Sequence, residues 1–134
     1  MKFASQLLIC FLLSYSGLAQ SKTKRSIQIL SVDFDIETPF RISCEIFKTS
    51  FSSHLLIDEI TNQDSIRMLD NYLDTVQYSN ESRFIDTRAE FVCKNKAGKA
   101  IRICMDRFSA SINGRIVDRN HPLYALLKSM IPQK

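Results

Sequence analysis

The chain has 134 residues, of which 45% are hydrophobic and 24% charged, with 3 Gly and 3 Pro, a composition typical of a globular protein. This composition excludes a disordered tail and a collagen-like repeat, and the length allows one domain rather than a multidomain enzyme. So few glycines also leave little scope for the glycine-rich loops that cradle phosphate groups.

Residues 1–19 predict a secretory signal peptide. Lys2 supplies a positive charge, residues 7–13 form a short apolar run, and small residues follow at Gly17 and Ala19, after which we expect cleavage. The run is shorter than the roughly 20 residues that a membrane span needs. We therefore expect an exported protein, periplasmic or secreted, with no transmembrane segment.

The expected mature chain begins with a basic leader. Residues 20–25 are polar and basic, so we interpret them as flexible, and residues 26–134 are predicted to form a single domain without repeats or linkers. Lys24-Arg25 also matches a dibasic processing site, and Asn80-Glu81-Ser82 matches an N-glycosylation acceptor. Both motifs are short enough to occur by chance.

Two alternating segments open the predicted domain. In residues 27–36, apolar side chains alternate with serine and aspartate, which predicts a half-buried strand. Residues 40–46 alternate in the same way after a break at Pro39, so the two segments are predicted to pair as a hairpin. A serine-rich connection then leads to a short apolar stretch at residues 55–57.

An amphipathic helix of about four turns is predicted next. Thr61 and Asp64 resemble a capping box at its start. Apolar residues then recur at helical spacing, with charged and polar residues on the opposite side; the apolar positions are Ile66, Leu69, Tyr72, Leu73 and Val76.

The clearest pattern is a β-hairpin within residues 89–106. Two alternating runs flank residues 95–99, which fit a three-residue loop with Gly98 in the left-handed region. This register places Cys93 opposite Ile101, so that one face is apolar and the other carries mixed charge.

Two short strands and a helix complete the chain. Residues 108–112 and 115–117 are predicted strands, joined by the turn signal Asn113-Gly114. Asn120 is predicted to cap a last helix whose first turn contains Pro122. The predicted fold class is α+β, with an antiparallel sheet of about five to six strands and the central and C-terminal helices packed on one face.

Three cysteines, Cys44, Cys93 and Cys104, follow the signal peptide. An odd number in an oxidising compartment favours one disulfide and one free thiol. Cys44 and Cys93 are predicted on apolar strand faces and Cys104 on the opposite face, so we predict a Cys44–Cys93 disulfide. Three reduced cysteines are the alternative, because a buried thiol is a common apolar filler.

No pattern in the sequence predicts catalysis. His54 and His121 lack the short spacing to cysteine that a zinc site needs, and there is no P-loop, dinucleotide-binding turn or nucleophile elbow. We therefore predict no catalytic residue, no metal site and no cofactor.

Charge is distributed unevenly along the chain. Residues 26–82 hold three basic and ten acidic residues, a net charge of −7. Residues 83–134 hold eleven basic and four acidic residues, a net charge of +7. The folded body is therefore neutral, which disfavours nucleic acid as a partner. Either acidic and basic strands lie side by side in the sheet, or a basic surface meets an acidic partner.

The leading functional prediction is an exported, non-enzymatic domain that binds another protein. Its binding surface is either an exposed face of the sheet or the basic hairpin, whose candidate residues are Lys94, Lys96, Lys99 and Arg102. The alternative is a small ligand-binding protein or hydrolase with a pocket between sheet and helices, using Tyr72, Phe91 or Cys104.

Overall fold

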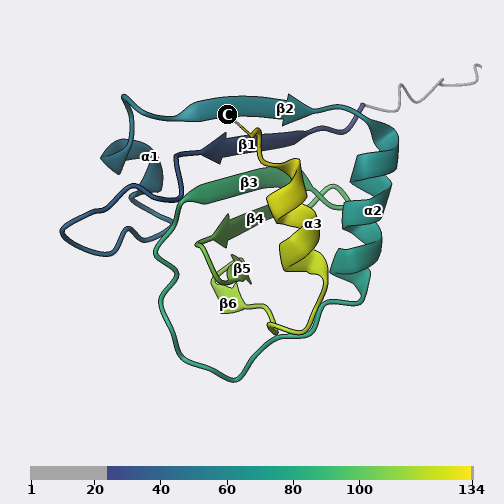
Figure 1. Ribbon diagram of the computed structural model, residues 1–134. Helices are drawn as coiled ribbons and strands as arrows, with labels where there is room; N and C mark the ends of the chain where they lie inside the picture. Colours follow the sequence, from purple (N-terminus) through teal and green to yellow (C-terminus); the bar gives the residue numbers. More distant parts are fainter. Residues whose placement is uncertain (1–23, 134) are drawn as a thin grey trace, which may run out of the picture.

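A six-stranded antiparallel sheet forms the frame of the computed structural model, which describes residues 24–133 (Figure 1). In chain order the elements are β1 (Ile27–Ser31), α1 (Phe47–Ser50), β2 (Leu56–Ile60), α2 (Gln63–Asp74), β3 (Ala89–Lys94), β4 (Ala100–Met105), β5 (Ala110–Ile112), β6 (Arg115–Ile116) and α3 (Leu123–Met130). The order across the sheet is β2-β1-β3-β4-β5-β6. The predicted α+β class is confirmed, and the predicted signal peptide lies outside the described residues.

Helices α2 and α3 pack on one face of the sheet, which we call the inner face. Alternate strand residues such as Ile29, Phe91 and Ile103 have no exposed surface there, and the helices add Leu69 and Leu127 to the same apolar core. The packing of both long helices on one face agrees with the prediction.

The predicted hairpin is confirmed residue by residue. Cys93 pairs with Ile101 in the ladder. The side chain of Asn95 accepts hydrogen bonds from the backbone N–H groups of Ala97 and Lys99, at 3.0 and 2.9 Å. Gly98 has a φ of +80°, the left-handed conformation that a side chain disfavours. Turn chemistry and alternation therefore specify the same register.

Both long helices begin slightly away from their predicted caps. Asn62, not Thr61, caps α2, because its side-chain oxygen accepts from the backbone N–H groups of Asp64 and Ser65 at 2.9 and 3.2 Å. Pro122 occupies the cap position of α3 and makes no side-chain cap hydrogen bond, so the expected cap at Asn120 was wrong by two residues.

The predicted hairpin of residues 27–36 with residues 40–46 is wrong. Strand β1 ends at Ser31, because the Asp33 carboxylate accepts from the Asp35 backbone N–H at 2.9 Å and turns the chain away from the sheet. The antiparallel partner of β1 on that side is β2, which contains the apolar stretch at residues 55–57.

Residues 40–46 instead cross the opposite, outer face of the sheet as an irregular segment. Ile42 is buried, and its backbone bonds to the Asp86 carboxylate at 2.8 Å and to the Thr87 N–H at 2.7 Å rather than to a neighbouring strand. Ile42 belongs to a second, smaller apolar cluster on the outer face, formed by Leu30, Val32, Ile42, Phe47 and Phe51.

The disulfide joins Cys44 to Cys104, with a Cα separation of 5.9 Å, and Cys93 is free and buried. The predicted Cys44–Cys93 pairing is therefore wrong. Cys104 was correctly placed on the face opposite to Cys93, but Cys44 lies on that outer face as well, because its segment crosses it instead of forming a strand. One disulfide and one free thiol remain the correct count for the described cysteines.

None of the helices in residues 24–133 combines the length and the apolar character required to cross a membrane.

Candidate functional site

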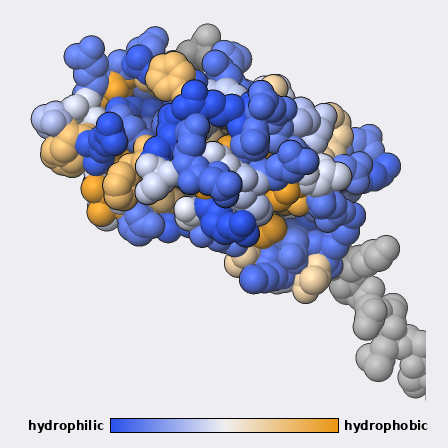
Figure 2. Space-filling view, turned by 90° about the horizontal axis from the view of Figure 1, so that it is seen from below, coloured by the Kyte–Doolittle hydropathy of each residue, from blue (hydrophilic) through white to orange (hydrophobic). Residues whose placement is uncertain are grey.

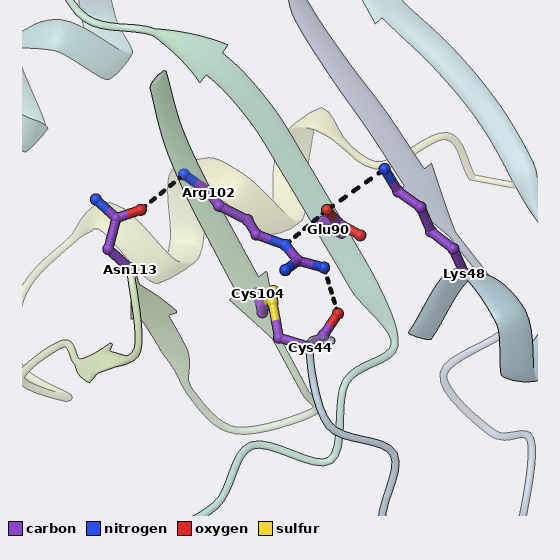
Figure 3. The surroundings of a disulfide bond; sticks show 6 residues. All are labelled: Cys44, Lys48, Glu90, Arg102, Cys104 and Asn113. Carbon is purple, nitrogen blue, oxygen red and sulfur yellow. Dashed lines mark hydrogen bonds and ion pairs between the residues drawn. A yellow bond between two sulfur atoms is a disulfide. The ribbon is translucent and has the colours of Figure 1, made fainter. Parts of the chain in front are cut away.

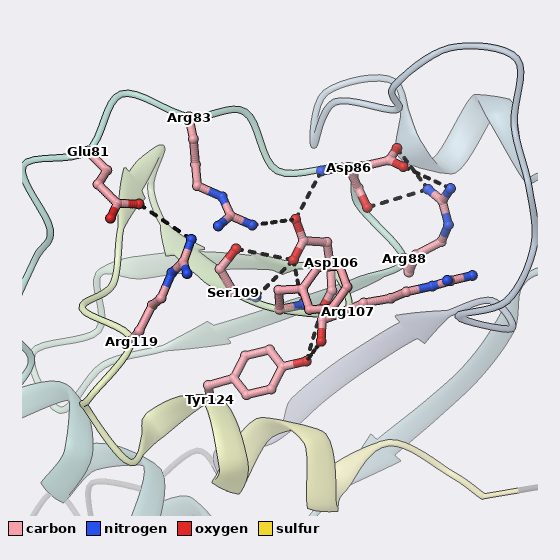
Figure 4. A network of polar contacts seen from close by, with 10 residues as sticks. Glu81, Arg83, Asp86, Arg88, Asp106, Arg107, Ser109, Arg119 and Tyr124 are labelled. Atoms are coloured by element: carbon pink, nitrogen blue, oxygen red, sulfur yellow. Dashed lines mark hydrogen bonds and ion pairs between the residues drawn. The ribbon is translucent and has the colours of Figure 1, made fainter.

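A cleft of about 530 Å³ opens at the end of the sheet where β3 begins and β4 ends. Three segments line it, with residues 36–38 and 41 from the first, residues 83, 84, 86 and 88 from the second, and the turn at residues 106–108 as the third. We call it the arginine–phenylalanine cleft, after the exposed Arg41, Phe84, Arg107 and Phe108 and the half-buried Arg83 in its lining. Figure 4 shows the polar network beneath it.

Asp106 holds the turn between β4 and β5 in shape. This buried carboxylate accepts from the backbone N–H groups of Phe108 and Ser109, both at 2.8 Å, and from the Ser109 hydroxyl at 3.1 Å. Its other oxygen accepts from the Asp86 N–H at 3.4 Å and lies 3.6 Å from the Arg83 guanidinium. One side chain thereby fixes the position of Phe108 and joins its turn to the segment that carries Phe84.

Arg88, just before β3, connects this strand to the cleft segment that contains Ile36 and Thr38. Its buried guanidinium makes a two-pronged pair with the Asp86 carboxylate at 2.9 and 3.0 Å. It also donates to the Ile36 carbonyl at 3.1 Å and to the Thr38 hydroxyl at 3.2 Å. A planar guanidinium can serve all these acceptors together, so Arg88 acts as structural support.

The turn at residues 106–108 receives further support from both sides. Arg107 donates to the Phe34 carbonyl at 2.6 Å and pairs with Asp35 at 3.3 Å. The Tyr124 hydroxyl, on α3, donates to the backbone carbonyl groups of Asp106 and Arg107, and burial raises the pKa of this phenol. The floor of the cleft is thus held by hydrogen bonds and an ion pair to neighbouring segments.

The rim of the cleft is aromatic. The exposed fractions of Phe84, Phe108 and the neighbouring Phe40 are 78%, 71% and 62%, whereas core phenylalanines such as Phe91 have none. Figure 2, a view from below Figure 1, shows hydrophobic groups in orange set among hydrophilic groups in blue. Large apolar side chains gathered at one surface are characteristic of interaction sites.

The charge of the rim is positive. Asp86 and Asp106 are used by the internal network, the exposed Asp35 pairs with Arg107, and Glu37 is the acid of the lining that forms no ion pair within residues 24–133. Arg41 is exposed and forms no ion pair within residues 24–133, and the 3.6 Å contact of Arg83 with Asp106 is long. Arginine side chains are therefore accessible beside the exposed rings.

The predicted basic hairpin does not form one patch. Lys96 pairs with Asp74 at 2.9 Å, a hydrogen bond that raises the pKa of the lysine. Arg102 turns onto the outer face, where it donates to the Glu90 carboxylate at 2.8 Å and to the Cys44 carbonyl. Lys94 and Lys99 are exposed. Two of the four predicted residues are thus engaged within the fold.

Glu90 lies at the centre of the outer face, beneath the disulfide (Figure 3). Arg102 and Lys48 approach one of its oxygens, at 2.8 and 3.8 Å, while the other oxygen is buried and has no hydrogen-bond partner among residues 24–133. The enclosed Glu90 carboxylate is not accessible to a ligand, and the contacts of Arg102 with Glu90 and Cys44, together with the Cys44–Cys104 bond, join the irregular segment to the sheet.

The residues proposed for the alternative pocket lie in the core. Phe91 and Cys104 have no exposed surface, and Cys104 carries no thiol because it is bonded to Cys44. Tyr72 is partly buried and packs edge-on against His121. Burial raises the pKa of the remaining thiol, Cys93, which makes it a poor nucleophile at neutral pH.

Within residues 24–133, His, Cys, Asp and Glu side chains do not assemble into a group of three or more that could hold a metal ion.

Sequence reasoning missed the arginine–phenylalanine cleft, although a local signal was present. Each of its three segments carries an adjacent pair: Phe40-Arg41, Arg83-Phe84 and Arg107-Phe108. Phe40 and Phe108 stand at the first positions of predicted strands, and Arg83-Phe84 lies outside the predicted elements, so no local pattern groups the three pairs. Their convergence depends on long-range contacts that no local pattern contains.

Comparison of the chain with family models, with curated proteins and with solved structures found no significant match.

Proposed function

We propose that this protein is an exported, non-enzymatic domain that binds another protein through the arginine–phenylalanine cleft. The observation that carries the proposal is the convergence of three chain segments at one cleft, whose rim carries the exposed rings of Phe84 and Phe108 beside Arg41, Arg83 and Arg107. Phenylalanine and arginine are enriched in protein interfaces. Aromatic rings supply much of the binding energy there because they bury a large area and lose little rotational freedom.

The construction beneath the rim supports the same conclusion. Buried Arg88, Asp86 and Asp106 fix the backbone of all three segments through hydrogen bonds. A rim that is ordered before binding loses less conformational entropy when a partner docks. The surplus of arginine favours a partner surface that contains carboxylates, since complementary charge steers association and fixes orientation.

Export is supported by the apolar N-terminal segment and by the Cys44–Cys104 bond, because disulfides persist mainly in oxidising compartments.

Quantitative co-purification from the native exported fraction tests the proposal. We expect the unmodified protein to retain a partner that the double variant Phe84→Ser, Phe108→Ser loses. Because both rings are exposed, the free energy of unfolding should change by less than about 0.5 kcal/mol. Thermal unfolding of the variant checks that condition.

The matched control is the double variant Lys94→Glu, Lys99→Glu at the hairpin turn, whose side chains are also exposed. Retention of the partner by this control and its loss by the phenylalanine variant would support the cleft. The reverse result would return the binding site to the basic hairpin and refute the proposed one.

A further inference from the structure

Strand β2 offers a second interaction surface. It differs in type from the cleft, because it is the edge of a sheet, and it does not depend on the function proposed for the cleft. In the described part of the chain, β1 is the strand that pairs with β2, which leaves the other edge of β2 open at the top of Figure 1. Its first four residues are exposed, and Ile57 has an exposed fraction of 67%. An open edge presents backbone N–H and C=O groups that can pair with an added strand. On β2 the Glu59 N–H donates to the Asp58 carboxylate at 2.9 Å, so an added strand that pairs there takes the place of this local hydrogen bond.

A hollow beside β2 provides room for side chains of such a strand. It measures about 540 Å³ and lies between β2 and the helices α2 and α3. Its apolar lining comes from Ile60, Met68, Leu126 and Met130, of which Met68 is 48% exposed. Methionine side chains adapt to differently shaped apolar groups, which suits a surface that receives another chain.

The charges on β2 indicate which kind of strand fits. Asp58 and Glu59 occupy its centre, are exposed, and form no ion pair with any residue in the range 24–133. Asp58 lies opposite Ile29 and Glu59 opposite Gln28 on β1, so neither acid has a basic cross-strand neighbour. Opposite charges placed across a ladder stabilise strand pairing.

We propose that an extended segment of another protein, carrying two adjacent basic residues among apolar ones, adds to β2 as a further strand of the sheet. The basic residues lie opposite Asp58 and Glu59, and an apolar side chain enters the hollow between β2 and the helices. Main-chain hydrogen bonds hold the segment, and the two acids select its charge.

A second copy of this chain is a poorer occupant of the same edge. Antiparallel pairing of all five residues of β2 with another β2 would place Asp58 directly opposite Asp58. Like charges in that position destabilise a ladder. The same acids that favour a basic segment therefore oppose self-association.

A peptide experiment tests the assignment. The probe is a short peptide with two adjacent lysines flanked by valine and threonine, and its matched control carries glutamates in place of the lysines. We expect the lysine peptide to slow amide hydrogen exchange across Leu56–Ile60 and to bind about tenfold more tightly than the glutamate peptide. A lysine peptide methylated on its backbone nitrogens should lose this effect, because it cannot complete the ladder.

Variants of the protein give the second arm of the test. Asp58→Asn with Glu59→Gln should abolish the preference for lysine, whereas Asp64→Asn with Glu81→Gln, which removes the same charge elsewhere on the surface, should keep it. Equal effects of the two peptides, or no slowing of exchange at β2, would overturn the proposal. A concentration-dependent dimer with protected β2 amides would assign the edge to a second copy and overturn it equally.

Discussion

The carboxylate of Asp70 is almost completely buried, and Arg25 is the residue that neutralises it. Two guanidinium nitrogens of Arg25 donate to the two carboxylate oxygens at 2.7 and 2.8 Å, and these bonds raise the pKa of the arginine. The same guanidinium also donates to the carbonyl of Lys94 at the end of β3. Arg25 therefore belongs to the folded domain, although the sequence pattern had placed it in a flexible leader at residues 20–25.

The Arg25–Asp70 pair yields a stability prediction. Arg25→Gln should lower the free energy of unfolding by about 2 kcal/mol, because it leaves a buried carboxylate without its charged partner. Lys24→Gln, which removes the neighbouring exposed charge, should change it by less than about 0.5 kcal/mol. Equal effects of the two substitutions in urea unfolding would contradict the pair's structural role.

Cys93 yields a reactivity prediction. Burial raises the pKa of its thiol, so the folded protein holds less of the reactive thiolate at neutral pH than an exposed cysteine would. Iodoacetamide should therefore label folded protein slowly, faster as the pH rises, and rapidly in urea. Rapid labelling of folded protein at neutral pH would contradict core burial and support the alternative of a thiol-based site.

At the scale of elements, the Cys44–Cys104 bond attaches the irregular segment on the outer face to β4. The bond closes a loop between cysteines with a sequence separation of 60. Because a loop of this length restricts the unfolded chain, loss of the bond should lower the free energy of unfolding by about 4 kcal/mol. We expect the pair Cys44→Ser, Cys104→Ser to accelerate amide exchange in residues 33–55 more than in β3 and β4. Unchanged exchange in residues 33–55 would show that the bond does not hold this segment.

Peptide mapping without reduction checks the connectivity itself. The structure predicts a linked fragment that contains Cys44 and Cys104, with Cys93 recovered as a free thiol. A fragment linking Cys44 to Cys93 would refute this arrangement of the outer face.

Elements defined by local signals could be predicted from the sequence, and elements defined by distant contacts could not. The β3–β4 hairpin was predictable because the Asn95 turn, Gly98 and the alternation all specify one register. The segment at residues 40–46 alternates like a strand, but Ile42 bonds to Asp86 and Thr87, far away in sequence. The same dependence on distant contacts hid the arginine–phenylalanine cleft, whose three segments meet only in the folded chain.

At the scale of the whole molecule, acids of residues 26–82 meet bases of residues 83–133 in three ion pairs of the described chain. Lys96 pairs with Asp74, Arg107 with Asp35 and Arg119 with Glu81. These contacts join turns, loops and α2. The charges of the two halves therefore do not pair across neighbouring strands, which was one of the two predicted arrangements. Surface pairs of this kind contribute little stability individually. The charges outside these pairs give an acidic sheet edge at β2 and an arginine-rich cleft at one end of the sheet.

The measurement that tests the central claim most directly is site-specific photocrosslinking of the protein in the cells that produce it. A photoreactive phenylalanine analogue would replace Phe108 or Phe84 at the cleft, with Ala125, an exposed position on α3, as the control. We predict one protein adduct from both cleft positions, none from the control, and loss of the adduct when Arg41→Glu is added. Absence of an adduct from the cleft positions, or an equal adduct from Ala125, would contradict the proposal that this cleft binds a protein partner.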